Sequence, residues 1–104
     1  MSHITYIYGL IDPDSGRIRY VGKSDTPLRR FERHLERART YLMLTKKEQW
    51  IRGILDHGKR PILKLLKIVP YDQWRAKELE MIHHYAMTED RIENRLYKFN
   101  VMGR

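Results

Sequence analysis

The sequence predicts an α+β fold with three strands and about three helices. Ile4–Ile11 and Arg17–Gly22 are rich in β-branched and aromatic residues, which favour strands. The five residues between them, Asp-Pro-Asp-Ser-Gly, are strong turn formers, so the two strands are expected to form an antiparallel hairpin. Three later stretches have apolar residues at helical spacing, and a short apolar run lies between the second and the third. These stretches predict the helices and the third strand.

The hairpin is expected to bring two tyrosines together. We expect Ile11 to pair with Arg17 across the turn, without a bulge. This register places Tyr8 opposite Tyr20. Directly opposite side chains share one face of a sheet, with Cβ atoms roughly 5 Å apart. Two phenol groups are therefore predicted to point at one spot.

The first helix is expected to begin just after the hairpin. Thr26 is the best placed of three candidate N-caps, and Pro27 suits the first helical position because its missing N–H costs nothing there. Its apolar stripe follows helical spacing and consists of Leu28, Phe31, Leu35, Ala38 and Leu42.

Two polar residues lie beside this stripe. Arg30 and His34 are four residues apart, so they share one side of the helix. They are expected at the edge of the core, near the end of the strand that carries Tyr20.

The second helix and the third strand have clear boundaries. Thr45, with Glu48 three residues later, forms a capping box that begins the helix, and Trp50 is expected in the core. The apolar run Ile62–Val69 is stopped by Pro70 and predicts the third strand.

The third helix, expected to be capped by Asp72, carries a carboxylate on its apolar stripe. Glu78 is four residues from both Trp74 and Ile82, so these side chains lie on one side of the helix. A carboxylate that faces a core is costly unless it is paired or bound to metal. Glu78 is therefore expected either to form a salt bridge at the rim of the core or to ligate a metal ion, whereas Glu80 has an ordinary solvent-facing position.

The charge of the chain points to an anionic partner. A formal net charge of +8 on 104 residues favours nucleic acid or a membrane surface. From residue 17 to residue 39, eight basic side chains stand against three acidic ones, so much of the excess lies on the hairpin and the first helix. The eight are Arg17, Arg19, Lys23, Arg29, Arg30, Arg33, Arg37 and Arg39.

Two absences narrow the class of protein. The sequence contains no cysteine, which excludes disulfides and thiolate zinc sites and fits a cytoplasmic location. No apolar run approaches 18 residues, so no membrane span is expected.

Three motifs now stand in order along the chain: Tyr6-Ile7-Tyr8, Tyr20-Val21-Gly22, and Arg30 with His34 four residues later. Together they resemble the GIY-YIG endonuclease family, with Tyr6 in the place of the usual first glycine. The resemblance extends over most of the chain. It implies a single domain over residues 1–104, in which a small three-stranded antiparallel sheet is flanked by about three helices.

The resemblance also implies a site. Its catalytic residues would be Tyr8, Tyr20, Arg30, His34 and Glu78, with Glu78 as the metal ligand. The late asparagine of the family corresponds to Asn100, and Asn94 is the competing candidate. The residues expected to bind phosphate or DNA are Lys23, Arg29, Arg33, Arg37 and Asn100.

The function expected from these residues is hydrolysis of DNA phosphodiester bonds with one divalent ion, Mg²⁺ or Mn²⁺. Tyr8 would activate the water if nearby cations lower its pKa, and His34 would accept its proton or orient it. Arg30 would stabilise charge on the phosphate or only bind it. The alternative function is a non-catalytic, basic nucleic-acid-binding module, and a third is the catalytic domain of a nuclease whose specificity domain or subunit lies elsewhere. The sequence leaves open DNA against RNA, cleavage of one strand or two, and the oligomeric state.

Overall fold

The computed structural model describes residues 3–88, and side chains for residues 3–85. The order of elements confirms the predicted α+β fold. The elements are β1 (Ile4–Ile11), β2 (Ile18–Ser24), α1 (Pro27–Thr40), α2 (Lys46–Asp56), β3 (Ile62–Pro70), a 3₁₀ turn (Tyr71–Gln73) and α3 (Trp74–Thr88).

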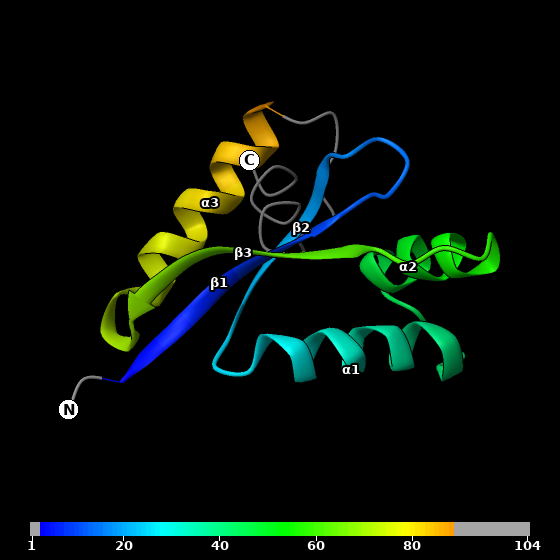
Figure 1. Cartoon of the computed structure of the whole chain (residues 1–104), viewed down its shortest axis with the longest axis horizontal. Helices are drawn as coiled ribbons and strands as arrows, with labels where there is room; N and C mark the ends of the chain where they lie inside the picture. Colours follow the sequence, from blue (N-terminus) through cyan, green and yellow to red (C-terminus); the bar gives the residue numbers. More distant parts are fainter. Residues whose placement is uncertain (1–2, 89–104) are drawn as a thin grey trace.

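The three strands form one antiparallel sheet in the order β2-β1-β3. Because β1 is central, β2 and β3 are the edge strands. Figure 1 shows α1 and α2 on one face of the sheet and α3 on the other. This arrangement confirms the sheet flanked by helices that the family resemblance implied.

The turn of the hairpin is built as predicted. The side chain of Asp12 accepts hydrogen bonds from the backbone N–H groups of Asp14 (2.8 Å) and Ser15 (3.3 Å), a local pattern that stabilises turns. Gly16 has φ +74°, a conformation that suits glycine because it has no Cβ.

The predicted register of the hairpin was wrong. Leu10 pairs with Tyr20 and Ile11 with Ile18, which leaves Arg19 as an extra residue in a β-bulge. Tyr8 is therefore opposite Gly22, not Tyr20. Gly22 and Tyr20 are two residues apart in β2, so these two positions are on the same face of the sheet. Tyr8 and Tyr20 are therefore diagonal neighbours on that face, with ring centroids 6.2 Å apart.

Each face of the sheet has its own core. The core under α3 has at its centre Ile7, Ile18, Val21, Val69 and Ile82. The core under α1 and α2 has at its centre Tyr8, Leu10, Phe31, Leu35, Ala38 and Ile51. Trp50 packs on this second core and is only partly buried, so the prediction of a core position holds in part.

The buried side of α1 differs from the predicted stripe. Leu28 is 74% exposed and Leu42 is 95% exposed. Leu42 follows the end of the helix at Thr40, so helical spacing no longer places it. His34 is only 2% exposed. It lies inside the buried face, whereas the sequence predicted a position at the edge of the core.

The helix starts were predicted with mixed success. Thr45 caps α2 as expected, because its Oγ1 accepts from the N–H of Glu48 (3.3 Å) while the Glu48 carboxylate accepts from the N–H of Thr45 (3.0 Å). Thr26 is the N-cap residue of α1, but its side chain makes no capping hydrogen bond. Asp72 lies within the 3₁₀ turn before α3 and is not the predicted helix cap.

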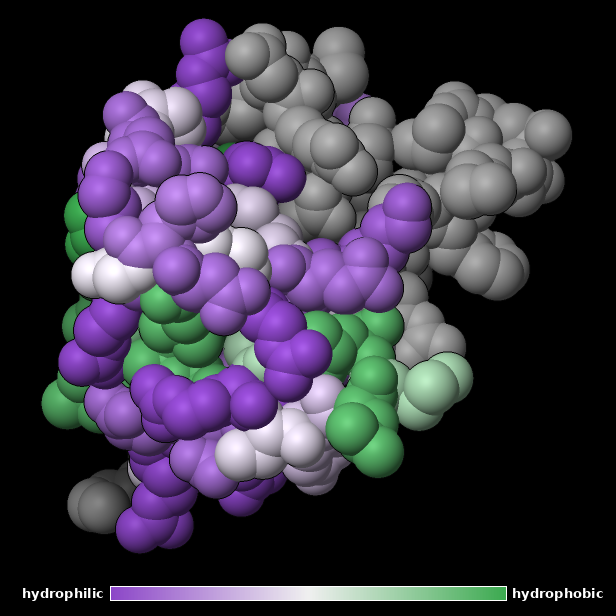
Figure 2. Space-filling model, turned by 90° about the vertical axis from the view of Figure 1, so that its right-hand side faces the viewer, coloured by the Kyte–Doolittle hydropathy of each residue, from purple (hydrophilic) through white to green (hydrophobic). Residues whose placement is uncertain are grey.

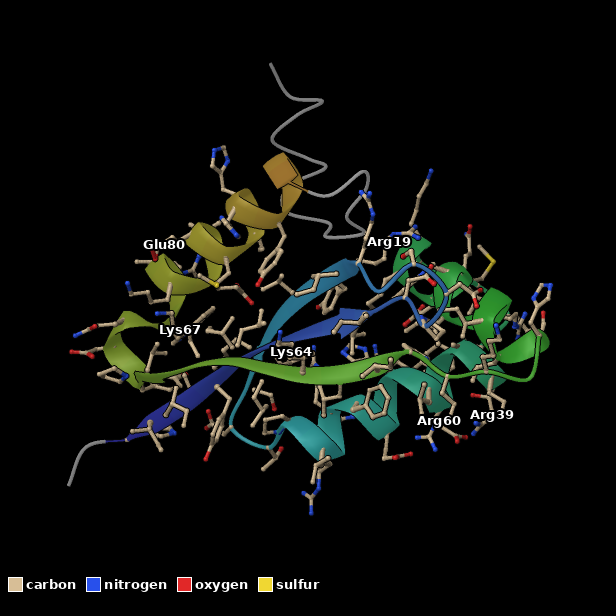
Figure 3. All side chains as sticks on the ribbon, turned by 45° about the horizontal axis from the view of Figure 1, so that its top comes forward. Arg19, Arg39, Arg60, Lys64, Lys67 and Glu80 are labelled. Atoms are coloured by element: carbon tan, nitrogen blue, oxygen red, sulfur yellow. The ribbon has the colours of Figure 1, made fainter. Side chains whose placement is uncertain are left out.

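The apolar run in β3 is less covered than its composition suggested. Ile62, Leu65 and Ile68 are at least half exposed, because β3 is an edge strand and its pairing with β1 shifts between Ile7 and Tyr8. Lys64 and Lys67 lie exposed along the same strand (Figure 3).

Figure 2 shows the molecule from the end at which α1 finishes. On this side the surface is mostly hydrophilic, and its apolar side chains lie in separate groups. At this end Leu42 and Met43 follow α1 and are almost fully exposed. Among residues 3–88, no helix is long and apolar enough to cross a membrane.

Candidate active site

A buried hydrogen bond joins β1 to α1. The hydroxyl of Tyr8 lies 2.7 Å from His34 Nε2, and Tyr8 is fully buried. Gly22 makes room for this tyrosine, because a Cβ added at Gly22 would lie 2.6 Å from the Tyr8 hydroxyl oxygen. The glycine of the Tyr20-Val21-Gly22 motif thus leaves the space that the phenol occupies.

His34 is held in its neutral form. Burial, followed by the positive charges of Lys47, Arg30, Arg37 and Arg33, lowers the pKa of His34 to about 3. A neutral imidazole protonated at Nδ1 has Nε2 free to accept. In that tautomer Tyr8 donates its hydroxyl proton to His34.

Tyr8 does not have the lowered pKa on which its expected role in activating the water depended. Burial and the neighbouring Tyr20 raise the pKa of Tyr8 and outweigh the lowering effect of Arg30. Desolvation of the charged phenolate is the stronger effect because the side chain is fully buried. Tyr8 is therefore a neutral phenol at pH 7, and its hydroxyl is hydrogen-bonded to His34.

Arg30 lies close to both phenols of the candidate site. It is one helical turn before His34 and is exposed. By its charge and by hydrogen bonding, it lowers the pKa of both Tyr8 and Tyr20. A guanidinium has five donors in a planar fork, so Arg30 can contact the phenols and still offer donors to a ligand.

Tyr20 completes the aromatic part of the site. Its ring centroid lies 5.5 Å from that of His34, in an edge-on arrangement. Burial raises the pKa of Tyr20, and the negative charge of Glu78 raises it further.

Glu78 reaches this group although α3 covers the opposite face of the sheet. Tyr20 lies on β2, which is an edge strand, and the Glu78 carboxylate is close enough to act on Tyr20. Burial raises the pKa of Glu78, opposed by the charges of Arg75, Lys23 and Arg30. The structure thus brings Glu78 within electrostatic reach of Tyr20 and Arg30.

The surroundings of Glu78 suit a single metal ion. Glu78 is half-buried, and within residues 3–85 no cation lies within ion-pair distance of it. The described residues contain no group of three or more His, Asp or Glu side chains that could hold a metal. A lone carboxylate fits Mg²⁺, which keeps several of its waters and uses few protein ligands.

Glu80 has the solvent-facing position that was expected. It is exposed and forms an ion pair with Lys77 at 3.2 Å. Figure 3 shows Glu80 on the outer side of α3, away from the sheet.

The predicted phosphate-binding residues that the structure describes come from two elements, β2 and α1. Lys23 is half-buried, with Nζ 4.7 Å from the ring centroid of Tyr71 and 5.0 Å from that of Trp74. Arg29, Arg33 and Arg37 are exposed on α1. Asn100 and Asn94 lie outside the described residues.

Sequence reasoning missed Lys47. This half-buried lysine is in the first turn of α2, and its Nζ lies 4.8 Å from the ring centroid of Tyr20. Burial, with the charges of Arg30 and Arg37, lowers the pKa of Lys47 to about 8 against the opposing effect of Glu48. Its position inside a capping box did not reveal the contact with Tyr20, because only the packing of α2 on α1 turns Lys47 towards that ring.

Comparison with known proteins places the chain in a family. No curated protein and no solved structure matches it. A family model, described as the GIY-YIG catalytic domain, matches residues 4–94. This stretch includes the sheet, the helices and every described residue of the candidate site. The chain therefore belongs to the GIY-YIG family of nucleases.

Proposed function

We propose that the protein is a metal-dependent endonuclease that hydrolyses DNA phosphodiester bonds. The observation that supports this most is the hydrogen bond of 2.7 Å between Tyr8 and His34, beside the exposed guanidinium of Arg30. A buried phenol joined to a neutral imidazole is a proton relay, and an arginine beside it is suited to a phosphate. GIY-YIG nucleases act on DNA, which favours DNA as the substrate.

The proton relay would run from water to imidazole. In the complex with DNA, where the phosphate would offset the cations that lower the pKa of His34, Tyr8 would give its proton to His34 Nε2 while its oxygen takes a proton from the attacking water. The water oxygen then forms a bond to phosphorus, and the bond from phosphorus to the 3′ oxygen breaks. This route requires no free phenolate, which agrees with the raised pKa of Tyr8.

Arg30 and Tyr20 would orient the phosphate. The guanidinium fork of Arg30 can donate to two phosphate oxygens at once, and it stabilises the charge that grows in the transition state. Tyr20 is placed to donate its hydroxyl to the phosphate or to the water, since it adjoins both Tyr8 and His34. Lys23, Arg29, Arg33 and Arg37 would hold the flanking DNA backbone.

Glu78 would hold the divalent ion. When bound, Mg²⁺ or Mn²⁺ supplies Lewis-acid stabilisation of the leaving 3′ oxygen. The half-buried carboxylate is suited to this, because burial leaves it poorly solvated and no described cation forms an ion pair with it.

A plasmid assay tests the proposal. Supercoiled plasmid is incubated with wild type, Glu78→Gln and the matched control Glu80→Gln, in Mg²⁺ and in EDTA. We expect Glu78→Gln to lower the nicking rate by about 10²-fold or more and Glu80→Gln to cleave like wild type. Equal nicking by wild type and Glu78→Gln would end the metal-ligand proposal. DNA binding by wild type with no nicking in Mg²⁺ or Mn²⁺ would instead identify a non-catalytic binding module.

A further inference from the structure

The charges of four cations from two helices act on His34, and one of these cations also lies against the ring of Tyr20. Arg30, Arg33 and Arg37 follow one another along α1, and Lys47 approaches from the first turn of α2. The Lys47 ammonium lies against the face of the Tyr20 ring at 4.8 Å. Its charge acts on His34, and Arg30 and Arg37 act on Lys47.

None of these cations forms an ion pair within residues 3–85. Among the described residues, no carboxylate lies within ion-pair distance of Lys47, Arg30 or Arg37. Glu48 adjoins Lys47 and its charge offsets part of this excess, although its carboxylate forms no ion pair with Lys47 and accepts a hydrogen bond from the N–H of Thr45 in the capping box. Like charges held close together in partly buried positions repel one another, so the free protein retains an unfavourable interaction that an anion would relieve.

The repulsion between Lys47 and the two arginines depends on the partial burial of Lys47. A lysine on a solvated helix face would extend into water and lose little by having cationic neighbours. Lys47 is half-buried, whereas the adjacent Lys46 is exposed. The packing of α1 against α2 therefore holds Lys47 close to Arg30 and Arg37.

We propose that Lys47, Arg30 and Arg37 form a phosphate-binding subsite between α1 and α2. Resting on the proposed function, this subsite would take a backbone phosphate of the DNA strand, and Lys47 would be a binding residue of the site in its own right. The planar donors of the two arginines and the compact ammonium of Lys47 suit a tetrahedral anion with several acceptor oxygens.

The subsite has a pH signature. The pKa of Lys47 is about 8 in the free protein, so a large share of the ammonium is lost between pH 7 and 9.5. The groups that face Lys47 are Arg30, Arg37 and His34 on α1, Tyr20 on β2, and Glu48 on its own helix. An anion favours the charged lysine, so phosphate binding should take up a proton and weaken as the pH rises through this interval.

The test measures DNA binding by fluorescence anisotropy in EDTA, so that it does not depend on cleavage. Lys47→Met is compared with Lys46→Met, which removes the same charge from the adjacent exposed position. We expect Lys47→Met to weaken binding at pH 7 by about tenfold and to lower the slope of log K against log salt by about 0.9. Lys46→Met should change the affinity less than about threefold, because an exposed charge is screened.

Lys47→Arg provides the second variant, since arginine keeps its charge at pH 9.5. Wild type should lose affinity between pH 7 and 9.5, and Lys47→Arg should lose clearly less. Inorganic phosphate, added at constant ionic strength, should compete with DNA in wild type and not in Lys47→Met if the subsite also takes free phosphate. Competition equal in the two proteins would show that free phosphate binds elsewhere and would limit the subsite to the DNA backbone.

The proposal is overturned if Lys47→Met and Lys46→Met weaken binding equally, or if Lys47→Arg follows the same pH profile as wild type. Circular dichroism and thermal unfolding of each variant separate these results from misfolding. Because the assay runs without metal, a protein that binds as expected but never cuts DNA would refute the nuclease function and leave the subsite standing.

Discussion

Replacing Gly22 by alanine should disable the site without unfolding the protein. An added Cβ would lie 2.6 Å from the Tyr8 hydroxyl oxygen, 2.7 Å from Tyr8 Cζ and 2.9 Å from Tyr20 Cε2. Gly22 does not have a positive φ, so alanine brings no backbone strain. The whole effect must come from the displacement of the two phenol rings.

The size of the effect follows from these distances. Ordinary contact begins at 3.4 Å, so the Tyr8 hydroxyl must move by about 0.8 Å, the difference between 3.4 and 2.6 Å. A shift of that size directed away from His34 would stretch the hydrogen bond of 2.7 Å to about 3.5 Å, beyond the usual range. Overpacking of a buried ring costs about 1–3 kcal/mol of stability, and a misplacement near 1 Å can cost about 10²-fold in rate.

The assay pairs plasmid nicking with urea unfolding and includes two control glycines. Gly9→Ala also places a Cβ close to side chains, at 3.1 Å from Ile18 Cδ1 and 3.3 Å from Leu66 Cδ1, but it does so on the α3 face. Gly53→Ala meets nothing within 4 Å in helix α2 and should stabilise the protein by about 0.5–1 kcal/mol. Only Gly22→Ala should lose nicking by about 10²-fold while it remains folded.

Two outcomes would refute this reasoning. One is folded Gly22→Ala that nicks plasmid within about threefold of wild type, given that about 10²-fold is expected. The other is an equal loss of nicking in Gly9→Ala, because that substitution does not touch the tyrosine side of the sheet.

Two further predictions concern stability. The pKa of His34 is about 3 in the folded protein, against an ordinary value of 6.5, so between these pH values the unfolded chain binds more protons than the folded protein. The free energy of unfolding should therefore fall as the pH drops below 6.5, by about 1.4 kcal/mol for each pH unit. Urea titrations from pH 7.5 to 4.5 check this, and a His34→Gln variant with the same steep acid dependence would contradict it. Thr45→Ala should cost about 1 kcal/mol because it removes a capping bond, whereas Thr26→Ala should cost clearly less because the Thr26 side chain makes no such bond. Equal losses in urea unfolding of the two variants would show that the capping bond at Thr45 contributes nothing.

Structural features that depend on neighbouring residues, such as turns and helix caps, could be predicted from the sequence. The hairpin, its Asp12–Gly16 turn and the Thr45 capping box depend on residues close together in the chain. The half-buried position of Glu78 and the exposed position of Glu80 also followed from helical spacing, because a carboxylate among apolar neighbours on one helix face is visible without coordinates.

Properties that arise between elements could not be read in this way. The bulge at Arg19 depends on how β2 pairs with β1, and it moved Tyr8 opposite Gly22. The burial of His34 depends on where α1 rests on the sheet, and with it the high pKa of Tyr8 and the low pKa of His34.

What the sequence by itself determined was the set of elements, the excess of basic residues and most of the side chains of the candidate site. Only the tertiary structure decided which of these groups are deprived of water and which charges they face. Lys47 illustrates the reason: its partners Tyr20, Arg30 and Arg37 come from a different strand and helix. Desolvation and Coulomb interaction depend on distance in space, and separation along the chain does not reveal that distance.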